Sequence, residues 1–110
     1  MSDESEKRFA EIEQLADDYA AAQAQSDYLD DFTKSLMSQL MKAAEAQGAK
    51  SAAIQERDAR ADGAFLTHLM GKQVATERAL ALKWKLTIWQ AKFEWARTKA
   101  ANRRAEMNLR

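Results

Sequence analysis

The sequence predicts an all-α fold: a long antiparallel helical hairpin with a short connecting helix. The first observation is that its 110 residues contain no proline and only three glycines, the two residue types that break or weaken helices. The second is that Ala, Glu, Gln, Lys, Arg, Leu and Met, which favour helices, dominate, while β-branched residues are scarce. The third is a heptad spacing of apolar residues. The length fits one domain, 1–110.

The first helix is expected over about residues 5–47. Its apolar stripe advances in alternating steps of three and four residues, as in helices that pack along a single partner. Two polar residues, Ser26 and Thr33, interrupt the stripe, and we expect looser packing there. The stripe consists of Ile12, Leu15, Tyr19, Ala22, Ser26, Leu29, Thr33, Leu36, Leu40 and Ala43.

The connecting segment is expected over residues 48–63. Gly48 is suited to end the first helix, and Ser51 is suited to cap a short helix over 52–61. The Asp62-Gly63 pair predicts a turn, after which the last helix runs over about 64–108. Gly71 inside that helix costs about 1 kcal/mol relative to alanine, a cost that close approach of another helix would explain.

The last helix carries two apolar rows, whose centres lie about 140° apart at 100° per residue. The first seam consists of Ala75, Ala79, Leu82, Leu86, Trp89, Phe93, Ala96 and Ala100. The second seam consists of Met70, Val74, Ala81, Trp84, Ile88, Ala91 and Trp95. A helix in an isolated hairpin needs one apolar face, so two faces predict a second partner.

The second seam is therefore the predicted oligomer interface, most simply of a homodimer that forms a four-helix bundle. Two alternatives remain open: the short helix over 52–61 covers this seam, or another protein does. The short helix contains one large aliphatic residue, Ile54, and is too short to cover the whole seam.

The net charge of zero conceals an asymmetry. Residues 1–47 contain eleven acids and four bases, whereas residues 48–110 contain six acids and thirteen bases. An antiparallel hairpin sets the two ends side by side, which favours internal charge matching. The alternative interpretations are that the basic or the acidic segment forms a surface that binds a partner. A nucleic-acid contact would use Lys92, Arg97, Lys99, Arg103 and Arg104. An acidic surface for a protein partner would use Asp17, Asp18, Asp30 and Asp31.

The sequence contains little that could support catalysis. It has no cysteine and a single histidine, His68, which we expect to be structural or solvated. Without a histidine pair, a Glu-x-x-His motif, a phosphate-binding glycine loop or a nucleophile motif, we expect no enzyme activity, metal, cofactor or small-molecule substrate. The bases Lys83, Lys85 and Lys92 alternate with tryptophans, a pattern seen in proteins that bind single strands, but the tryptophans' seam positions favour a packing role.

No run of about 18 apolar residues is present, so no membrane contact is expected. The charged beginning of the sequence lacks the apolar stretch of a signal peptide, and the absence of cysteine fits a reducing compartment. These features predict a cytoplasmic protein.

Several segments over about residues 40–108 resemble a group of small, uncharacterised helical proteins of tailed bacteriophages and prophages, early-region products encoded near recombination genes. They are GAKSAAIQERDA (Gly48–Ala59), Trp84, AKFEW (Ala91–Trp95) and ANRRAE (Ala101–Glu106). Members often have proline in the turn, where this chain has Asp62-Gly63. The resemblance implies a bacterial host cytoplasm and a role in phage DNA metabolism or host takeover, and it identifies no site residue.

These features together lead to one functional expectation with two alternatives. The leading hypothesis is a non-catalytic phage accessory protein in DNA recombination or replication, a helical dimer that contacts DNA or a DNA-processing protein. The first alternative is an inhibitor of a host nuclease or defence protein that uses the acidic first helix as a DNA mimic. The second is a purely structural helical hairpin.

Overall fold

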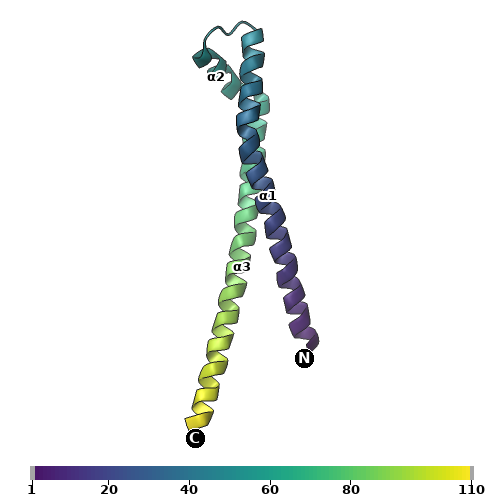
Figure 1. Cartoon of the computed structure of the whole chain (residues 1–110), viewed down its shortest axis with the longest axis vertical. Helices are drawn as coiled ribbons and strands as arrows, with labels where there is room; N and C mark the ends of the chain where they lie inside the picture. The colour runs from purple at the N-terminus through teal and green to yellow at the C-terminus, as the bar shows by residue number, and fades with distance from the viewer. Residues whose placement is uncertain (1, 110) are drawn as a thin grey trace. The chain divides into compact units, whose positions relative to one another are not determined.

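The computed structural model describes residues 2–109 and contains three helices and no strand within that range. They are α1 (Ser2–Ala46), α2 (Ala52–Ala61) and α3 (Gly63–Leu109) (Figure 1). The predicted all-α hairpin with a short connecting helix is confirmed. The helix bounds differ from the predicted ones by three residues at the start of α1 and by one residue at its end and at each end of α3.

Gly48 ends α1 as predicted. Its backbone has φ of 110°, a left-handed conformation that glycine adopts without a steric cost. The Gly48 N–H donates to the Glu45 carbonyl, and the Ala49 N–H donates to the Ala44 carbonyl, both at 3.0 Å. This pair of hydrogen bonds is the Schellman motif, which satisfies the last carbonyl groups of a helix.

The two short connections are held by side-chain caps. The Ser51 hydroxyl accepts a hydrogen bond from the Ile54 N–H at 3.2 Å and caps α2, as predicted. Asp62 closes α2, and its carboxylate also accepts from the Ala64 N–H at 2.8 Å. Asp62 therefore ends one helix and caps the next, which is why α3 begins directly at Gly63.

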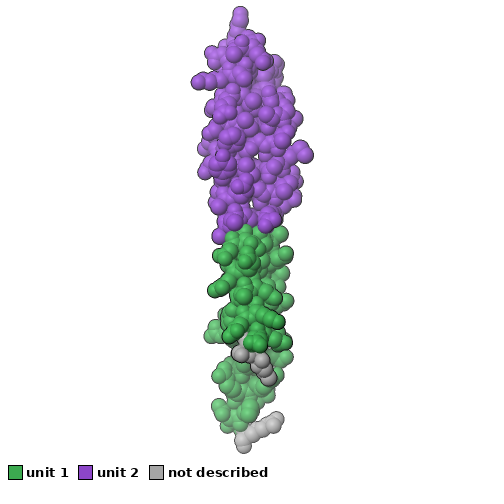
Figure 2. Space-filling model, turned by 90° about the vertical axis from the view of Figure 1, so that its right-hand side faces the viewer, with its two compact units in different colours: residues 1–19, 80–110 green, residues 20–79 purple. Residues whose placement is uncertain are grey.

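The chain divides into two compact units (Figure 2). Unit 1 contains Met1–Tyr19 and Leu80–Arg110, and unit 2 contains Ala20–Ala79. Each unit includes a segment of α1 and a segment of α3, and α2 belongs to unit 2.

Unit 2 is held by the middle of the predicted α1 stripe. Ala22 and Ser26 are buried, and Leu29, Thr33, Leu36 and Leu40 are partly buried. The contacts between α1 and α3 join Ser26 to Thr76, Asp30 to Lys72 and Thr33 to His68. Rising residue numbers in α1 meet falling numbers in α3, so the two segments are antiparallel.

Polar side chains inside unit 2 pair across the hairpin. Ser26 Oγ lies 3.2 Å from Thr76 Oγ1, and the Ser26 side chain is buried. The expectation of looser packing at Ser26 is therefore wrong, because its hydroxyl finds a partner that makes burial tolerable. No buried side-chain nitrogen or oxygen in residues 2–109 lacks a hydrogen-bond partner.

His68 has the structural role that the sequence suggested. Its Nε2 lies 2.7 Å from Thr33 Oγ1, and its ring packs edge-on against Phe32 at 5.5 Å between centroids. When the Thr33 hydroxyl donates its one proton to the Leu29 carbonyl at 2.9 Å, its oxygen accepts the shared hydrogen bond from the His68 Nε2–H.

The buried apolar residues of unit 2 are spread over all three helices: Ala22 of α1, Ala59 of α2, and Phe65 and Ala79 of α3. Ala59 is 1% exposed and Phe65 is buried. The Gln55 amide donates to the Ala49 carbonyl at 3.0 Å and ties α2 to the connection that follows α1. α2 therefore contributes one almost fully buried alanine and one side-chain hydrogen bond to this unit.

Unit 1 is held by aromatic and leucine side chains. The Phe9 and Phe93 rings stack at 6.1 Å between centroids, and Trp89 lies 6.3 Å from Phe93. Ile12, Leu15 and Tyr19 of α1 are half-buried, as are Leu82, Leu86 and Trp89 of α3. The first seam is therefore the one that faces α1, although its last members, Ala96 and Ala100, are exposed.

Candidate interaction surface on α3

The second seam of α3 is exposed along its whole length. In unit 1, Trp84 is 62% exposed, Ile88 is 52% exposed and Trp95 is 66% exposed, with Ala81 and Ala91 also exposed between them. In unit 2, Met70 and Val74 are exposed as well. The alternative in which α2 covers the whole seam is wrong, because α2 leaves Met70 and Val74, the seam residues of its own unit, exposed.

Helical spacing explains why these side chains remain outside. Residues 84, 88, 91 and 95 follow steps of four, three and four, which keep them on one face of a helix. The same helix already uses Leu82, Leu86 and Trp89 to face α1. Large apolar side chains that are gathered on a solvent-exposed face mark a surface suited to binding a partner.

Basic side chains gather on α3 beside and beyond the second seam. Lys92, Arg97, Lys99, Arg103 and Arg104 are all exposed. Arg97 lies 3.5 Å from Glu94, an exposed pair that contributes little to stability. The other four form no ion pair within residues 2–109. These four bases therefore remain available to an anionic partner.

Two of these bases lie over tryptophan rings. The Lys92 ammonium is 5.3 Å from the Trp89 ring centroid, and the Lys99 ammonium is 4.7 Å from the Trp95 ring centroid. Cation–π contacts at exposed sites are worth about 0.5–1 kcal/mol. They position the charges next to the two seams without neutralising them.

The four acidic candidates do not form one cluster. Asp17 and Asp18 belong to unit 1, whereas Asp30 and Asp31 belong to unit 2. Asp18 accepts a hydrogen bond from the Gln14 amide at 2.9 Å. Asp30 pairs with Lys72 at 2.5 Å, and the Lys72 hydrogen bond and charge lower the pKa of the Asp30 carboxyl. Sequence reasoning missed this pair, because Lys72 belongs to neither apolar seam and lies far from Asp30 in the sequence.

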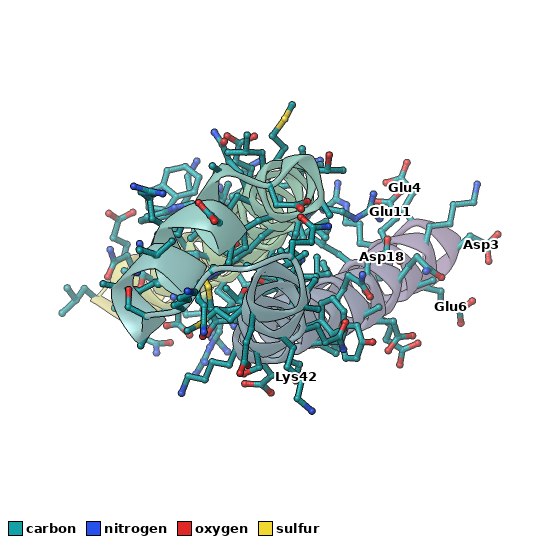
Figure 3. The ribbon with its side chains drawn as sticks, turned by 90° about the horizontal axis from the view of Figure 1, so that it is seen from above. Asp3, Glu4, Glu6, Glu11, Asp18 and Lys42 are labelled. Atoms are coloured by element: carbon teal, nitrogen blue, oxygen red, sulfur yellow. The ribbon has the colours of Figure 1, made fainter. Side chains whose placement is uncertain are left out.

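The charge asymmetry of the sequence is concentrated in unit 1. Residues 1–19 contain seven acids and two bases, and residues 80–110 contain two acids and eight bases. Figure 3 shows Glu4 and Glu11 on one side of α1 and Glu6 on another. Within residues 2–109, the one ion pair that joins α1 to α3 is Lys72–Asp30 of unit 2. Any charge matching between the α1 and α3 segments of unit 1 therefore acts without close ion pairs.

A hollow of about 310 Å³ lies beside the aromatic contacts of unit 1. Arg8 of α1 and Lys92 of α3 line it, together with Trp89, Phe93 and Ala96. Sequence reasoning did not assign Arg8 to this region, because the other residues that line the hollow lie far from Arg8 in the sequence. The hollow is largely apolar with two basic residues, and it contains no acid or base pair for catalysis.

The part of the chain that the structure describes offers no metal centre and no membrane span. No group of three or more histidines and carboxylates comes together among these residues. None of the helices within 2–109 has a stretch that is apolar enough to span a bilayer. Comparisons with protein-family models, with curated proteins and with solved structures give no match.

Proposed function

We propose that this chain is a non-catalytic accessory protein that acts as a helical dimer and contacts DNA or a DNA-processing protein in bacteriophage recombination or replication, in the cytoplasm of the bacterial host. The observation that carries the proposal is the exposed second seam of α3, with a basic helix end directly beyond it. The phage context rests on the resemblance of residues 40–108 described above.

Self-association is supported by the exposed side chains of the second seam. Trp84 and Trp95 lie three turns apart on one face, with more than three fifths of each surface in solvent. Two hairpins that pack through this seam would form a four-helix bundle, in which each α3 has a partner on both apolar faces. A second copy is the simplest partner, because its seam has the same composition and length.

A phosphate contact is supported by the α3 segment beyond Trp95. Residues 96–109 are exposed and include Arg97, Lys99, Arg103 and Arg104. Lysine and arginine side chains that neutralise phosphates release counterions, which gives affinity without sequence preference. Such binding suits an accessory protein that works on DNA of any sequence.

The alternative is an inhibitor of a host nuclease or defence protein that uses the acidic α1. The specific observation in its favour is the exposure of Asp17 and Asp31. Against it, Asp30 is already neutralised by Lys72, and Asp18 already accepts a hydrogen bond. A DNA mimic needs carboxylates that are spaced along one face and free to accept from the target. The basic surface therefore remains the stronger proposal, ahead also of a purely structural hairpin.

Binding of a fluorescently labelled single-stranded oligonucleotide tests the DNA contact, measured by anisotropy at low and near-physiological salt. The test variant is Arg103→Ala with Arg104→Ala. The matched control is Arg57→Ala with Arg60→Ala, which changes the net charge equally but alters α2. We expect the test variant to bind more weakly and with a shallower salt dependence, and the control to bind like the wild type. Equal loss in both variants would indicate only a net-charge effect.

Sedimentation or light scattering tests the dimer. We expect a dimer mass for the wild type and a lower mass for Trp84→Ala with Trp95→Ala. Tyr28→Ala, which removes an exposed aromatic side chain of α1, is the matched control and should keep the wild-type mass. A wild-type monomer at all concentrations would contradict the dimer. If neutralising Asp17, Asp18, Asp30 and Asp31 abolished activity while the basic variant stayed active, the inhibitor alternative would replace the DNA proposal.

A further inference from the structure

The second seam has a defined heptad phase within unit 1. If Ala81, Ile88, Trp95 and Asn102 occupy position a, then Trp84, Ala91 and Thr98 occupy position d. All seven side chains are exposed on the single helix α3. The phase matters because positions a and d form the contact between two coiled helices, and positions e and g flank it.

The two flanks of this seam differ in charge. Position e holds Lys85, Lys92 and Lys99, three lysines at intervals of seven residues. Position g holds Leu80, Thr87 and Glu94, which include one acid and no base. The charge on the flanks selects the orientation of the partner helix, since flanking residues decide which helices pair and in which direction.

We propose that a second copy of this chain packs on the second seam with its α3 parallel to the first. This inference rests on the dimer of the proposed function and specifies its geometry. In an antiparallel pair, position e faces position e of the partner, so lysines would face lysines. In a parallel pair, position e faces position g, so Lys99 meets Glu94, and Lys85 and Lys92 meet the uncharged Leu80 and Thr87.

The residues at position a agree with the parallel arrangement. Ile88 is β-branched, and in a parallel coil a β-branched residue at position a favours two strands over three or four. Asn102 is polar at the same position, a substitution that fixes register and the number of strands. Ala81 and Ala91 each lie one layer before a tryptophan, and their small side chains leave room for the large rings.

A parallel pair has a consequence for DNA binding. It brings the two exposed segments that follow Trp95 to the same end of the dimer. Arg97, Arg103 and Arg104 of both copies would then contact one nucleic acid, doubling the number of phosphates neutralised. Because each phosphate contact adds about −0.9 to the logarithmic salt slope on duplex DNA, the dimer should show about twice the slope of a monomeric variant.

Single-cysteine cross-linking tests the orientation, since the natural chain contains no cysteine. The variants Ala81→Cys and Ala91→Cys replace small exposed residues of the seam, ten residues or about 15 Å apart along α3. The control Gln90→Cys replaces an exposed residue on another face. Each variant is first checked by circular dichroism for wild-type helicity and by light scattering for mass, and is then oxidised. A disulfide requires Cα atoms within about 7 Å.

We expect Ala81→Cys and Ala91→Cys each to give more than half of the chain as a covalent dimer, and Gln90→Cys to give little. A symmetric antiparallel pair can bring at most one of the two positions opposite its own copy. A dimer mass with one or neither seam variant cross-linked would therefore overturn the parallel arrangement and leave the dimer intact. A monomer mass would overturn both, and the oligonucleotide assay reports on the DNA proposal separately.

Discussion

Gly71→Ala should stabilise the protein, and the structure allows the magnitude to be worked out. Gly71 lies inside α3, and a Cβ added there meets no atom within 4 Å, so no helix within residues 2–109 requires its small size. The expectation that a close helix explains Gly71 is therefore not met within the chain. Alanine is more favourable than glycine in a helix interior by about 0.8–1.0 kcal/mol. For 110 residues, this gain corresponds to a rise in melting temperature of about 4 °C.

Gly48→Ala is the matched control, with the opposite sign. A Cβ at Gly48 also meets nothing within 4 Å, but the backbone φ of 110° is one that alanine rarely adopts. We expect this variant to lose about 1–2 kcal/mol. Both are measured by urea denaturation at one fixed protein concentration, because self-association makes stability depend on concentration. A destabilised Gly71→Ala would refute the reasoning and indicate that a second molecule packs against the Gly71 backbone.

Three further predictions concern contacts of the hairpin. Thr33→Val should lower the free energy of unfolding by about 1 kcal/mol, because the His68 Nε2 loses its acceptor. Adding His68→Leu should recover most of that loss. A double-mutant cycle that shows no coupling between the two positions would contradict the shared hydrogen bond. Pairing with Lys72 lowers the pKa of the Asp30 carboxyl. The contribution of this pair to stability is therefore present above pH 3.8, the ordinary pKa of the carboxyl, and is lost as the pH falls below that value. In urea titrations, the acid-induced loss of stability should be smaller for Asp30→Asn than for the wild type. Ser51→Ala should cost about 1 kcal/mol by removing the cap of α2, and Ser51→Asp should retain that cap in the same denaturation assay.

The hairpin itself could be predicted from the sequence because its determinants are local or periodic. The heptad stripe from Ile12 to Leu40 becomes the partly buried face of α1. Gly48 and Ser51 act within a few residues of their own positions, so their roles as helix stop and cap could be recognised without knowing the fold. The second role of Asp62, as the cap of α3, was missed because the Asp62-Gly63 pair was interpreted only as a turn.

The polar contacts between the helices could not be predicted, since they depend on the register of two segments that lie far apart in the sequence. Ser26 and Thr33 look like interruptions of an apolar stripe until Thr76 and His68 are placed opposite them. A shift of one residue in register would separate both pairs. Periodicity indicates which face of a helix packs, but it does not determine which partner residue each side chain meets.

The charges of unit 1 show why the sequence alone supported both internal charge matching and a binding surface. Three lysines flank both seams. Each directly precedes a residue of the first seam (Leu86, Phe93 or Ala100) and also occupies position e of the second seam: Lys85, Lys92 and Lys99. On α1, Glu11 directly precedes Ile12, the corresponding position of the α1 stripe, and antiparallel helices place such flanking rows beside each other. One row of lysines therefore flanks both seams, the one that faces α1 and the exposed one. Because these lysines form no close ion pair within residues 2–109, their charges remain available for the partner contacts that we propose, and in that proposal a bound polyanion would compete with Glu11 for the same charges.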